Sequence, residues 1–197
     1  GQTEFLAQAF GIKDYAMLMY SEKLKVCLLS THLSLKEAIE KVTKQNIVSK
    51  VKLIAKEYEK WFGYEPSVGI LGLNPHAGEG GLIGEEEVKE ILPAIEELRS
   101  EGYKVEGPLS PDSAFLSKSC DVFLCMYHDQ GLIPFKLLAF KDGVNMTLGI
   151  PIPRTSPDHG TAYDIAWKGI ADLSPSLHAL RLCEELAKLR KQGRANP

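Results

Sequence analysis

Three histidines each follow a short apolar stretch of the sequence. Such stretches are typical of buried strands, and the carboxyl ends of strands in an open α/β sheet form the edge where ligands bind. Three imidazoles that meet there and leave coordination positions open suit a catalytic divalent metal. The alternative is coincidence, because strand ends often carry polar residues. The histidines are His32, His76 and His128, after the apolar stretches 24–30, 67–73 and 121–126.

Cationic and amide side chains follow the third histidine. Lys136 stands eight residues after His128 and is expected at the same strand end, with Gly131 and Pro134 ending the strand. Lys136, Asn145 and Arg154 are the kind of donors that a phosphate or carboxylate ligand needs. The alternative is that these side chains are simply solvated. A fourth histidine, His159, lies in a Gly-Thr-Ala loop, where it either binds a ligand or only orders the loop.

A glycine-rich segment, 74–84, surrounds His76 and opens a helix. Glu85, Glu86 and Glu87 are expected to favour the positive end of that helix's dipole. The segment is neither G-x-x-x-x-G-K-[ST] nor a good G-x-G-x-x-G, so it predicts neither a P-loop nor a Rossmann nucleotide site. The alternative for this segment is a simple flexible loop.

The elements that must position these residues alternate between helix and strand. This order predicts an α/β layered domain without an internal boundary, a single unit over 1–197. The first two strands are expected to form a hairpin. Helices are predicted at 3–10, from Ser34 (with Glu37 completing a capping box), at 46–62, at 85–99 with an interruption at Pro93, and from Ser174 or Ser176 to about Leu189. Strands are predicted at 15–20, 24–30, 67–73, 103–106, 121–126 and 144–149, with an extended segment at 150–157.

Composition excludes several classes of partner. A net charge of −3 gives no electrostatic reason for binding nucleic acid or an anionic membrane. No apolar run is long enough to span a bilayer, and no signal peptide is visible. The four cysteines form no C-x-x-C pair and are interpreted as buried thiols in a reducing compartment. The expected location is therefore cytoplasmic.

Several motifs together resemble one family, 4-hydroxythreonine-4-phosphate dehydrogenase of pyridoxal phosphate biosynthesis. The similarity covers nearly the whole chain, and the N-P-H-A-G-E and Y-H-D-Q-G motifs are specific to that family. The matching stretches are 1–4 (GQTE), 31–33 (THL), 73–79 (LNPHAGE), 107–109 (GPL), 127–131 (YHDQG) and 158–166 (DHGTAYDIA).

This resemblance implies an isocitrate/isopropylmalate dehydrogenase-like α/β fold and a homodimer with its site at the subunit interface. It implies NAD-dependent oxidation of 4-phosphooxy-L-threonine at C3, followed by loss of CO2 to give 3-amino-2-oxopropyl phosphate. A divalent metal (Zn, Mg or Co) polarises the hydroxyl and then the ketone in such a reaction, and stabilises the enolate.

The resemblance also implies roles for individual residues. The metal ligands would be His32, His76 and His128. Substrate contacts would be Gln2, Thr3, Lys136, Asn145 and Arg154. The loop 158–166 resembles the nucleotide loop of the wider dehydrogenase superfamily, with His159, Gly160, Thr161 and Ala162 as the residues that bind the cofactor.

Two departures from the family pattern bear on the function. Gln2 stands where the family has a histidine, and an amide cannot act as a general base. The family also has a substantial portion before this point, so we expect a fragment that folds, dimerises and binds metal without necessarily turning over. Three alternatives remain: a related dehydrogenase of another phosphorylated four-carbon hydroxy acid, a metal hydrolase or lyase, and an inactive metal-binding dimerisation fragment.

Overall fold

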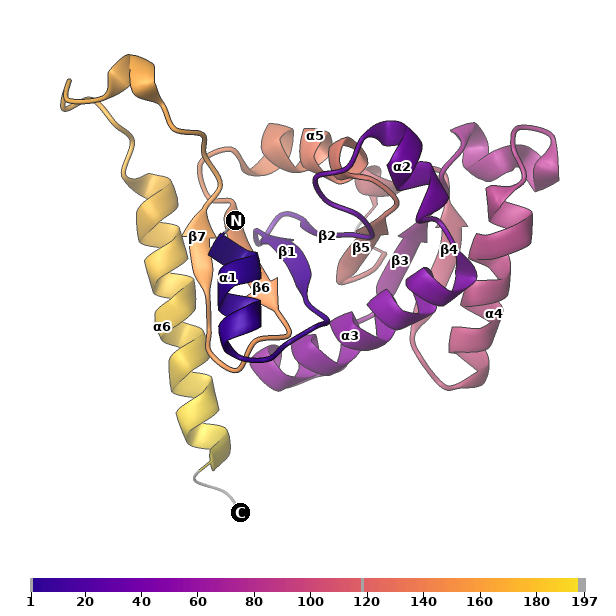
Figure 1. Cartoon of the computed structure of the whole chain (residues 1–197), viewed down its shortest axis with the longest axis horizontal. Helices are drawn as coiled ribbons and strands as arrows, with labels where there is room; N and C mark the ends of the chain where they lie inside the picture. The colour runs from indigo at the N-terminus through magenta and orange to yellow at the C-terminus, as the bar shows by residue number, and fades with distance from the viewer. Residues whose placement is uncertain (1, 118, 195–197) are drawn as a thin grey trace.

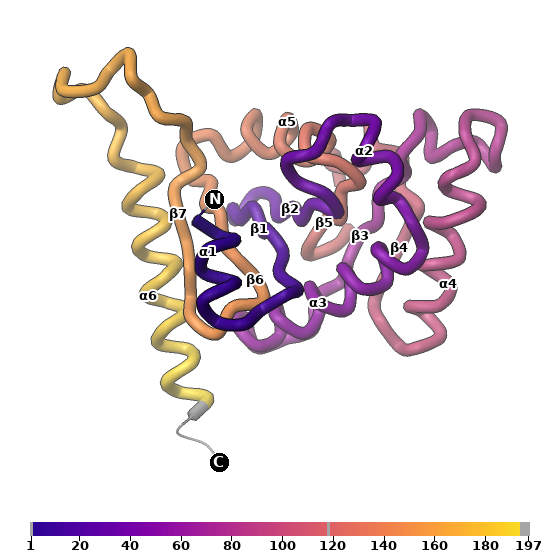
Figure 2. Tube along the Cα trace, viewed as in Figure 1, coloured from indigo at the N-terminus to yellow at the C-terminus, as the bar shows by residue number. Residues whose placement is uncertain are grey.

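Seven strands form one mixed sheet with helices on both faces (Figures 1 and 2). The computed structural model describes residues 2–117 and 119–194. The strands are β1 (Ala16–Tyr20), β2 (Lys25–Leu28), β3 (Val68–Leu71), β4 (Val105–Leu109), β5 (Val122–Cys125), β6 (Val144–Leu148) and β7 (Thr155–Pro157). The α-helices are α1 (Gln2–Ala9), α2 (Leu35–Glu40), α3 (Lys44–Phe62), α4 (Leu92–Ser100), α5 (His128–Ala139) and α6 (Ser174–Arg194). Shorter helical turns are η1 (Pro75–Gly81), η2 (Glu87–Ile91), η3 (Ala114–Leu116) and η4 (Tyr163–Ile165).

The strand order, β4-β3-β5-β2-β1-β6-β7, places the ends of three strands at one edge of the sheet. Strand β5 pairs in parallel with both β2 and β3, so the carboxyl ends of all three point the same way. Strands β1 and β2 form the predicted antiparallel hairpin, and β6 pairs antiparallel with β1. The predicted common edge for the segments that carry the three histidines is therefore confirmed.

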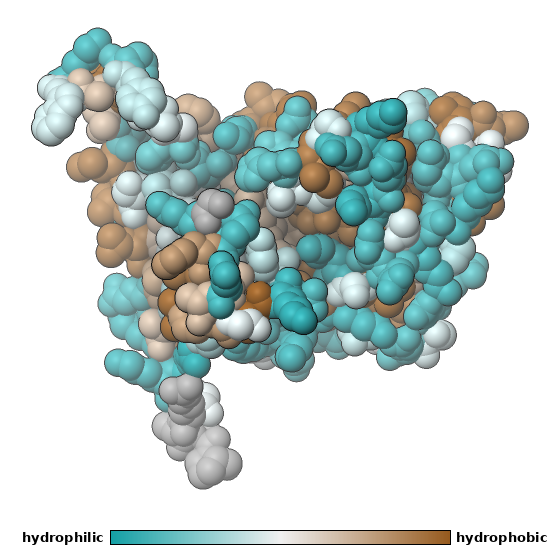
Figure 3. All heavy atoms as spheres, in the orientation of Figure 1, coloured by the Kyte–Doolittle hydropathy of each residue, from teal (hydrophilic) through white to brown (hydrophobic). Residues whose placement is uncertain are grey.

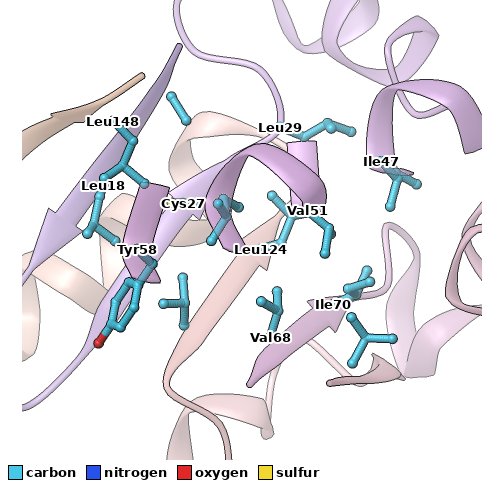
Figure 4. Close-up of a cluster of buried hydrophobic side chains, with 14 of the residues drawn as sticks. Leu18, Cys27, Leu29, Ile47, Val51, Tyr58, Val68, Ile70, Leu124 and Leu148 are labelled. Atoms are coloured by element: carbon cyan, nitrogen blue, oxygen red, sulfur yellow. The ribbon is translucent and has the colours of Figure 1, made fainter. Parts of the chain in front are cut away.

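The core lies on both faces of the sheet because the central strands are apolar on both sides. On β5, Val122 and Leu124 join the cluster under α3, α4 and α6, whereas Phe123 and Cys125 join the cluster under α5. This alternation follows from the two-residue period of a strand. Figure 4 shows part of the first cluster, where Val51 and Tyr58 of α3 lie against the sheet. Strands buried on both faces read as the continuous apolar runs seen in the sequence.

The segment after β5 forms a helix, α5, that was not predicted. The sequence predicts that Gly131 and Pro134 end the strand, but both residues lie inside an α-helix of 12 residues. A Cβ atom on Gly131 would lie 2.9 Å from side-chain atoms of Val26 and Leu28. The glycine therefore lets the helix pack closely on the sheet, and this packing outweighs the poor helix propensity of glycine and proline.

Several element boundaries and side-chain orientations also differ from the predictions. Helix α3 begins at Lys44 with Thr43 as its cap, not at Asn46. The capping box of Ser34 and Glu37 is confirmed. Three apolar side chains predicted to face the core are exposed instead: Leu35 and Ile39 on α2, and Leu180 on α6. They are exposed because no other described element covers the short helix α2 or the outer side of α6. Among the described residues, no helix combines the length and apolar character needed to cross a membrane.

Candidate active site

A buried glutamine links two of the strand ends that form the candidate site. The side chain of Gln130 accepts a hydrogen bond from the backbone N–H of Met126 (2.7 Å) and donates one to the carbonyl oxygen of Gly72 (2.9 Å). Met126 follows β5 and Gly72 follows β3. A buried amide with both ends bonded fixes the two backbones relative to each other. The Gln of the Y-H-D-Q-G motif is thus structural: it holds the edge that carries the histidines.

The structure brings two of the three predicted metal ligands together. The rings of His32, before α2, and His128, at the start of α5, have centroids 5.6 Å apart. The Nδ1 atom of His128 lies 2.7 Å from a carboxylate oxygen of Asp129. A carboxylate on one ring nitrogen orients the imidazole and leaves the other nitrogen free, which is a common arrangement around metal-binding histidines.

The donor set of this pair fits a divalent metal. Zinc–nitrogen bonds are about 2.0–2.1 Å long, so two rings at this separation can share one ion. Within residues 2–117 and 119–194, however, no group of three His, Cys, Asp or Glu side chains is placed to hold a metal. His76 lies outside the pair, and its role as a third ligand stays a prediction.

His76 projects from an unusual turn. It is exposed, and the residues from His76 to Gly80 all have positive φ angles between 44° and 79°. For residues with a side chain, this left-handed conformation costs roughly 1–2 kcal/mol each. A buried carboxylate, that of Glu87, accepts hydrogen bonds from the backbone N–H groups of Leu73 and Asn74. Glu87 therefore stabilises the turn, whereas we had expected it only to favour a helix dipole.

A cleft of about 1100 Å³ lies beside the histidine pair. Its walls come from α1, α3, β1, β6 and the segment after β2, and five of the predicted site residues line it: Gln2, Thr3, His32, Asn145 and Arg154. Six cationic side chains line the cleft against two acidic ones, Glu4 and Asp14. Because opposite charges attract across a concave surface, the cleft favours an anionic ligand.

Arg154 is a cleft cation held by two side-chain hydrogen bonds. Its guanidinium donates hydrogen bonds to the hydroxyl oxygens of Thr3 (2.8 Å) and Thr147 (2.7 Å). Both bonds are made by Nη1, one of the three nitrogens of the guanidinium, and they join α1 to β6. The partly buried Arg154 is therefore held ready for a phosphate or carboxylate, so simple solvation does not describe it.

Lys50 is a cleft residue that the sequence analysis missed. It lies on α3, where its ammonium donates a hydrogen bond to the carbonyl oxygen of Tyr15 (3.3 Å). Burial lowers the pKa of Lys50. It shares one face of α3 with Asn46, Ser49, Leu53 and Lys56, which also line the cleft. In the sequence, Lys50 lies beside the unbroken apolar stripe of this helix and looks like part of an ordinary solvated face.

The remaining predicted site residues lie outside the lining of this cleft. Lys136 is eight residues along α5 from His128, about 12 Å at 1.5 Å per residue, so it does not join the histidine at the strand end as we expected. Its ammonium lies 3.6 Å from the carboxylate of Asp158. Four residues predicted to bind the cofactor are exposed, in a segment between β7 and α6 that projects from the sheet (Figure 1): His159, Gly160, Thr161 and Ala162.

Comparison with known proteins bears on what this arrangement does. The family model described as "Pyridoxal phosphate biosynthetic protein PdxA" matches residues 1–183. The chain belongs to the PdxA family. Among its curated relatives, the 4-hydroxythreonine-4-phosphate dehydrogenase of Aquifex aeolicus is 66% identical over 94% of this chain and 58% of its own length. The chain thus spans about three fifths of the length of the curated PdxA relatives it matches.

Other PdxA relatives differ in the substrate that their names give. The D-threonate 4-phosphate dehydrogenase of Pectobacterium atrosepticum is 42% identical over 95% of this chain and 58% of its own length. Among solved structures, the 4-hydroxythreonine-4-phosphate dehydrogenase of Klebsiella pneumoniae superposes with a TM-score of 0.84 at 42% identity, covering 94% of this chain and 57% of that one. The fold is therefore the isocitrate/isopropylmalate dehydrogenase-like fold of the PdxA dehydrogenases.

Proposed function

We propose that this chain carries the substrate and metal site of a 4-hydroxythreonine-4-phosphate dehydrogenase. The observation that supports it is the basic cleft, in which Arg154 and Thr3 lie on one wall and His32 on another. The reaction would oxidise C3 of 4-phosphooxy-L-threonine with NAD. The resulting β-keto acid would lose CO2 and give 3-amino-2-oxopropyl phosphate.

The residues of the chain have separate tasks in this proposal. Arg154 binds an anionic group of the substrate, and the hydroxyl of Thr3 keeps the guanidinium in place. Asn145 lines the same cleft and supplies an amide donor. Lys136 and the loop residues His159, Gly160, Thr161 and Ala162 lie outside the cleft, and we propose that they contact substrate and NAD in the assembled enzyme. Asp129 holds the His128 ring in a fixed orientation.

The proposed cofactors are NAD and a divalent ion, Zn, Mg or Co. When bound, NAD accepts the hydride and the ion polarises the substrate oxygen and stabilises the negative charge that develops on decarboxylation. His32 and His128 would hold the ion, with His76 as the third imidazole. Because His76 lies outside the pair in one chain, we propose that the three imidazoles meet across a subunit interface.

A homodimer is the assembly that this proposal requires. The outer face of α5 and the residue that caps its C-terminus carry large apolar side chains that no described residue covers: Ile133, Leu137 and Phe140, with exposed fractions of 60%, 80% and 76%. In the view of Figure 3, polar side chains cover much of the surface over α2 and α3. Exposed apolar side chains gathered on one helix face mark interaction sites.

The oligomeric state is open to a direct test. We expect a dimeric mass by light scattering for this chain at micromolar concentration, and a monomeric mass for Leu137→Glu, because a buried carboxylate at the interface is costly. Circular dichroism would establish that the variant keeps its fold. A monomeric mass for the unmodified chain would contradict the homodimer.

Formation of NADH tests the proposed reaction. It would be followed with added Zn²⁺, Mg²⁺ or Co²⁺ on this chain alone and on this chain joined to the amino-terminal portion of the Aquifex aeolicus relative. Two substrates should be compared, 4-phosphooxy-L-threonine and D-threonate 4-phosphate, because relatives are named for both activities. The proposal predicts NADH with the first substrate for at least the longer chain. If neither chain reduces NAD while both bind metal, the dehydrogenase assignment fails.

Gln2 is expected to reduce turnover of 4-phosphooxy-L-threonine. It lines the cleft beside Thr3, but an amide cannot take up or release a proton near neutral pH. We expect Gln2→His to raise kcat about 100-fold, the low end of the effect of a positioned acid–base group. Gln8→His, on the same helix but outside the cleft lining, is the matched control. Equal rates for Gln2→His and the unmodified chain would mean that this position does not limit the reaction.

A further inference from the structure

A buried carboxylate lies directly beneath the turn that carries His76. Glu87, on η2, is only 1% exposed. One of its oxygens accepts hydrogen bonds from the backbone N–H groups of Leu73 (2.7 Å) and Asn74 (2.6 Å). The other oxygen accepts one from the side-chain amide of Asn74 (2.8 Å). In the described part of the chain no cation lies at ion-pair distance from Glu87, so these amide donors are what compensates its burial.

The turn is built closely around this carboxylate. Gly78 has a φ angle of +79°, and a Cβ atom placed on it would lie 2.7 Å from an oxygen of Glu87. A Cβ atom on Gly72 would lie 2.8 Å from the Cα atom of Ala77 and 3.1 Å from the other oxygen. Residues on both sides of His76 are therefore in contact with, or within reach of, one buried group.

The chemistry of the contacts requires a carboxylate at this position. Three N–H donors point at the two oxygens of Glu87. A glutamine of the same shape has one oxygen, and its NH2 group would face one of these donors. Left-handed conformations at His76, Ala77 and Glu79 are unfavourable by themselves, so the turn persists only where surrounding contacts hold it.

We propose that Glu87 is the positioning residue for His76: its carboxylate locks the left-handed turn in the conformation that presents the imidazole to a divalent cation. The metal role of His76 rests on the proposed function, whereas the hold of Glu87 on the turn rests on the hydrogen bonds and close contacts of the described residues. The two parts are therefore tested by different measurements.

Amide hydrogen exchange tests the hold on the turn without any metal. In Glu87→Gln we expect the amides of residues 73–80 to exchange at least about tenfold faster, because the variant loses one acceptor oxygen and gains an opposed donor. Glu86→Gln is the matched control: Glu86 accepts a bond from the Asn74 side-chain amide (2.7 Å) but is partly exposed and bonds neither backbone N–H group of residues 73 and 74. Unchanged exchange in a folded Glu87→Gln would overturn the proposal.

A second variant covers the case in which Glu87→Gln does not fold. Gly78→Ala places a methyl group against the carboxylate and is expected to give faster exchange of residues 73–80 than Gly80→Ala, which has a similar positive φ but nothing within 4 Å of an added Cβ atom. Amides of β5 report on the rest of the fold in each variant. If Gly78→Ala is folded and its turn exchanges as slowly as that of the unmodified chain, the carboxylate does not set the conformation of the turn, and the proposal fails.

Titration with Co²⁺ tests the presentation of the imidazole. We expect Glu87→Gln to weaken Co²⁺ binding by about 10–100-fold, the usual effect of removing a group that orients a ligand. Glu86→Gln should bind like the unmodified chain. If His76→Ala weakens binding but a folded Glu87→Gln does not, the positioning role is wrong. If His76→Ala itself leaves binding unchanged, the proposed metal role of His76 is wrong, and hydrogen exchange alone then decides on Glu87.

Discussion

Alanine in place of His32 or His128 is expected to weaken Co²⁺ or Zn²⁺ binding at least about 100-fold. The two rings lie 5.6 Å apart and supply both nitrogen donors of the pair that one chain brings together. Losing an outer group that only orients a ligand costs 10–100-fold in affinity, so losing a ligand itself should cost more. Isothermal titration calorimetry on each variant measures the change.

The chain offers a matched control and an intermediate case for this experiment. Nδ1 of His178, on α6, donates a hydrogen bond to the carbonyl oxygen of Ser174, and His178 is not among the residues that line the cleft, so His178→Ala should leave metal affinity unchanged. Asp129→Asn keeps both histidines but weakens the contact with the His128 ring, and its loss of affinity should be smaller than that of His128→Ala. Unchanged affinity in both His32→Ala and His128→Ala would remove the metal site from this edge of the sheet.

Replacing Arg154 with methionine is expected to weaken binding of 4-phosphooxy-L-threonine by about 10–150-fold. Hydrogen bonds to charged groups contribute about 1.5–3 kcal/mol, and each 1.4 kcal/mol is a factor of ten in the dissociation constant. Arg154 lines the cleft, and hydrogen bonds to Thr3 and Thr147 hold its guanidinium in place. The methionine variant therefore loses both the positive charge and the planar arrangement of hydrogen-bond donors. Calorimetric titration of the chain with the substrate measures the effect.

Two companion variants separate charge from structure at this position. Arg154→Lys keeps the charge without the planar fork and should bind with intermediate affinity. Arg181→Met removes an exposed arginine of α6 and should bind like the unmodified chain. Because Arg154 also joins α1 to β6, circular dichroism should establish that Arg154→Met keeps its helices. Equal affinity in the folded methionine variant would mean that the anion binds elsewhere.

The sequence by itself determined most of the strands and helices. Apolar runs such as 121–126 could be recognised because a strand buried on both faces must be apolar throughout. The capping box of Ser34 could be recognised because both of its hydrogen bonds are made within four residues. The motifs around His76 and His128 indicated the family, which the match over residues 1–183 shows. Each of these signals is local in the chain.

Only the tertiary structure decided how the site is assembled. Gly131 and Pro134 argue against a helix locally, yet close packing on β2 and β5 makes α5 the stable choice. Glu87 had the sequence environment of a helix start, but folding brings the backbone of residues 73 and 74 onto its carboxylate. The pairing of His32 with His128, 96 positions away, depends on β2 and β5 being neighbours in the sheet. Strand order is set by long-range packing, which no local spacing of residues encodes.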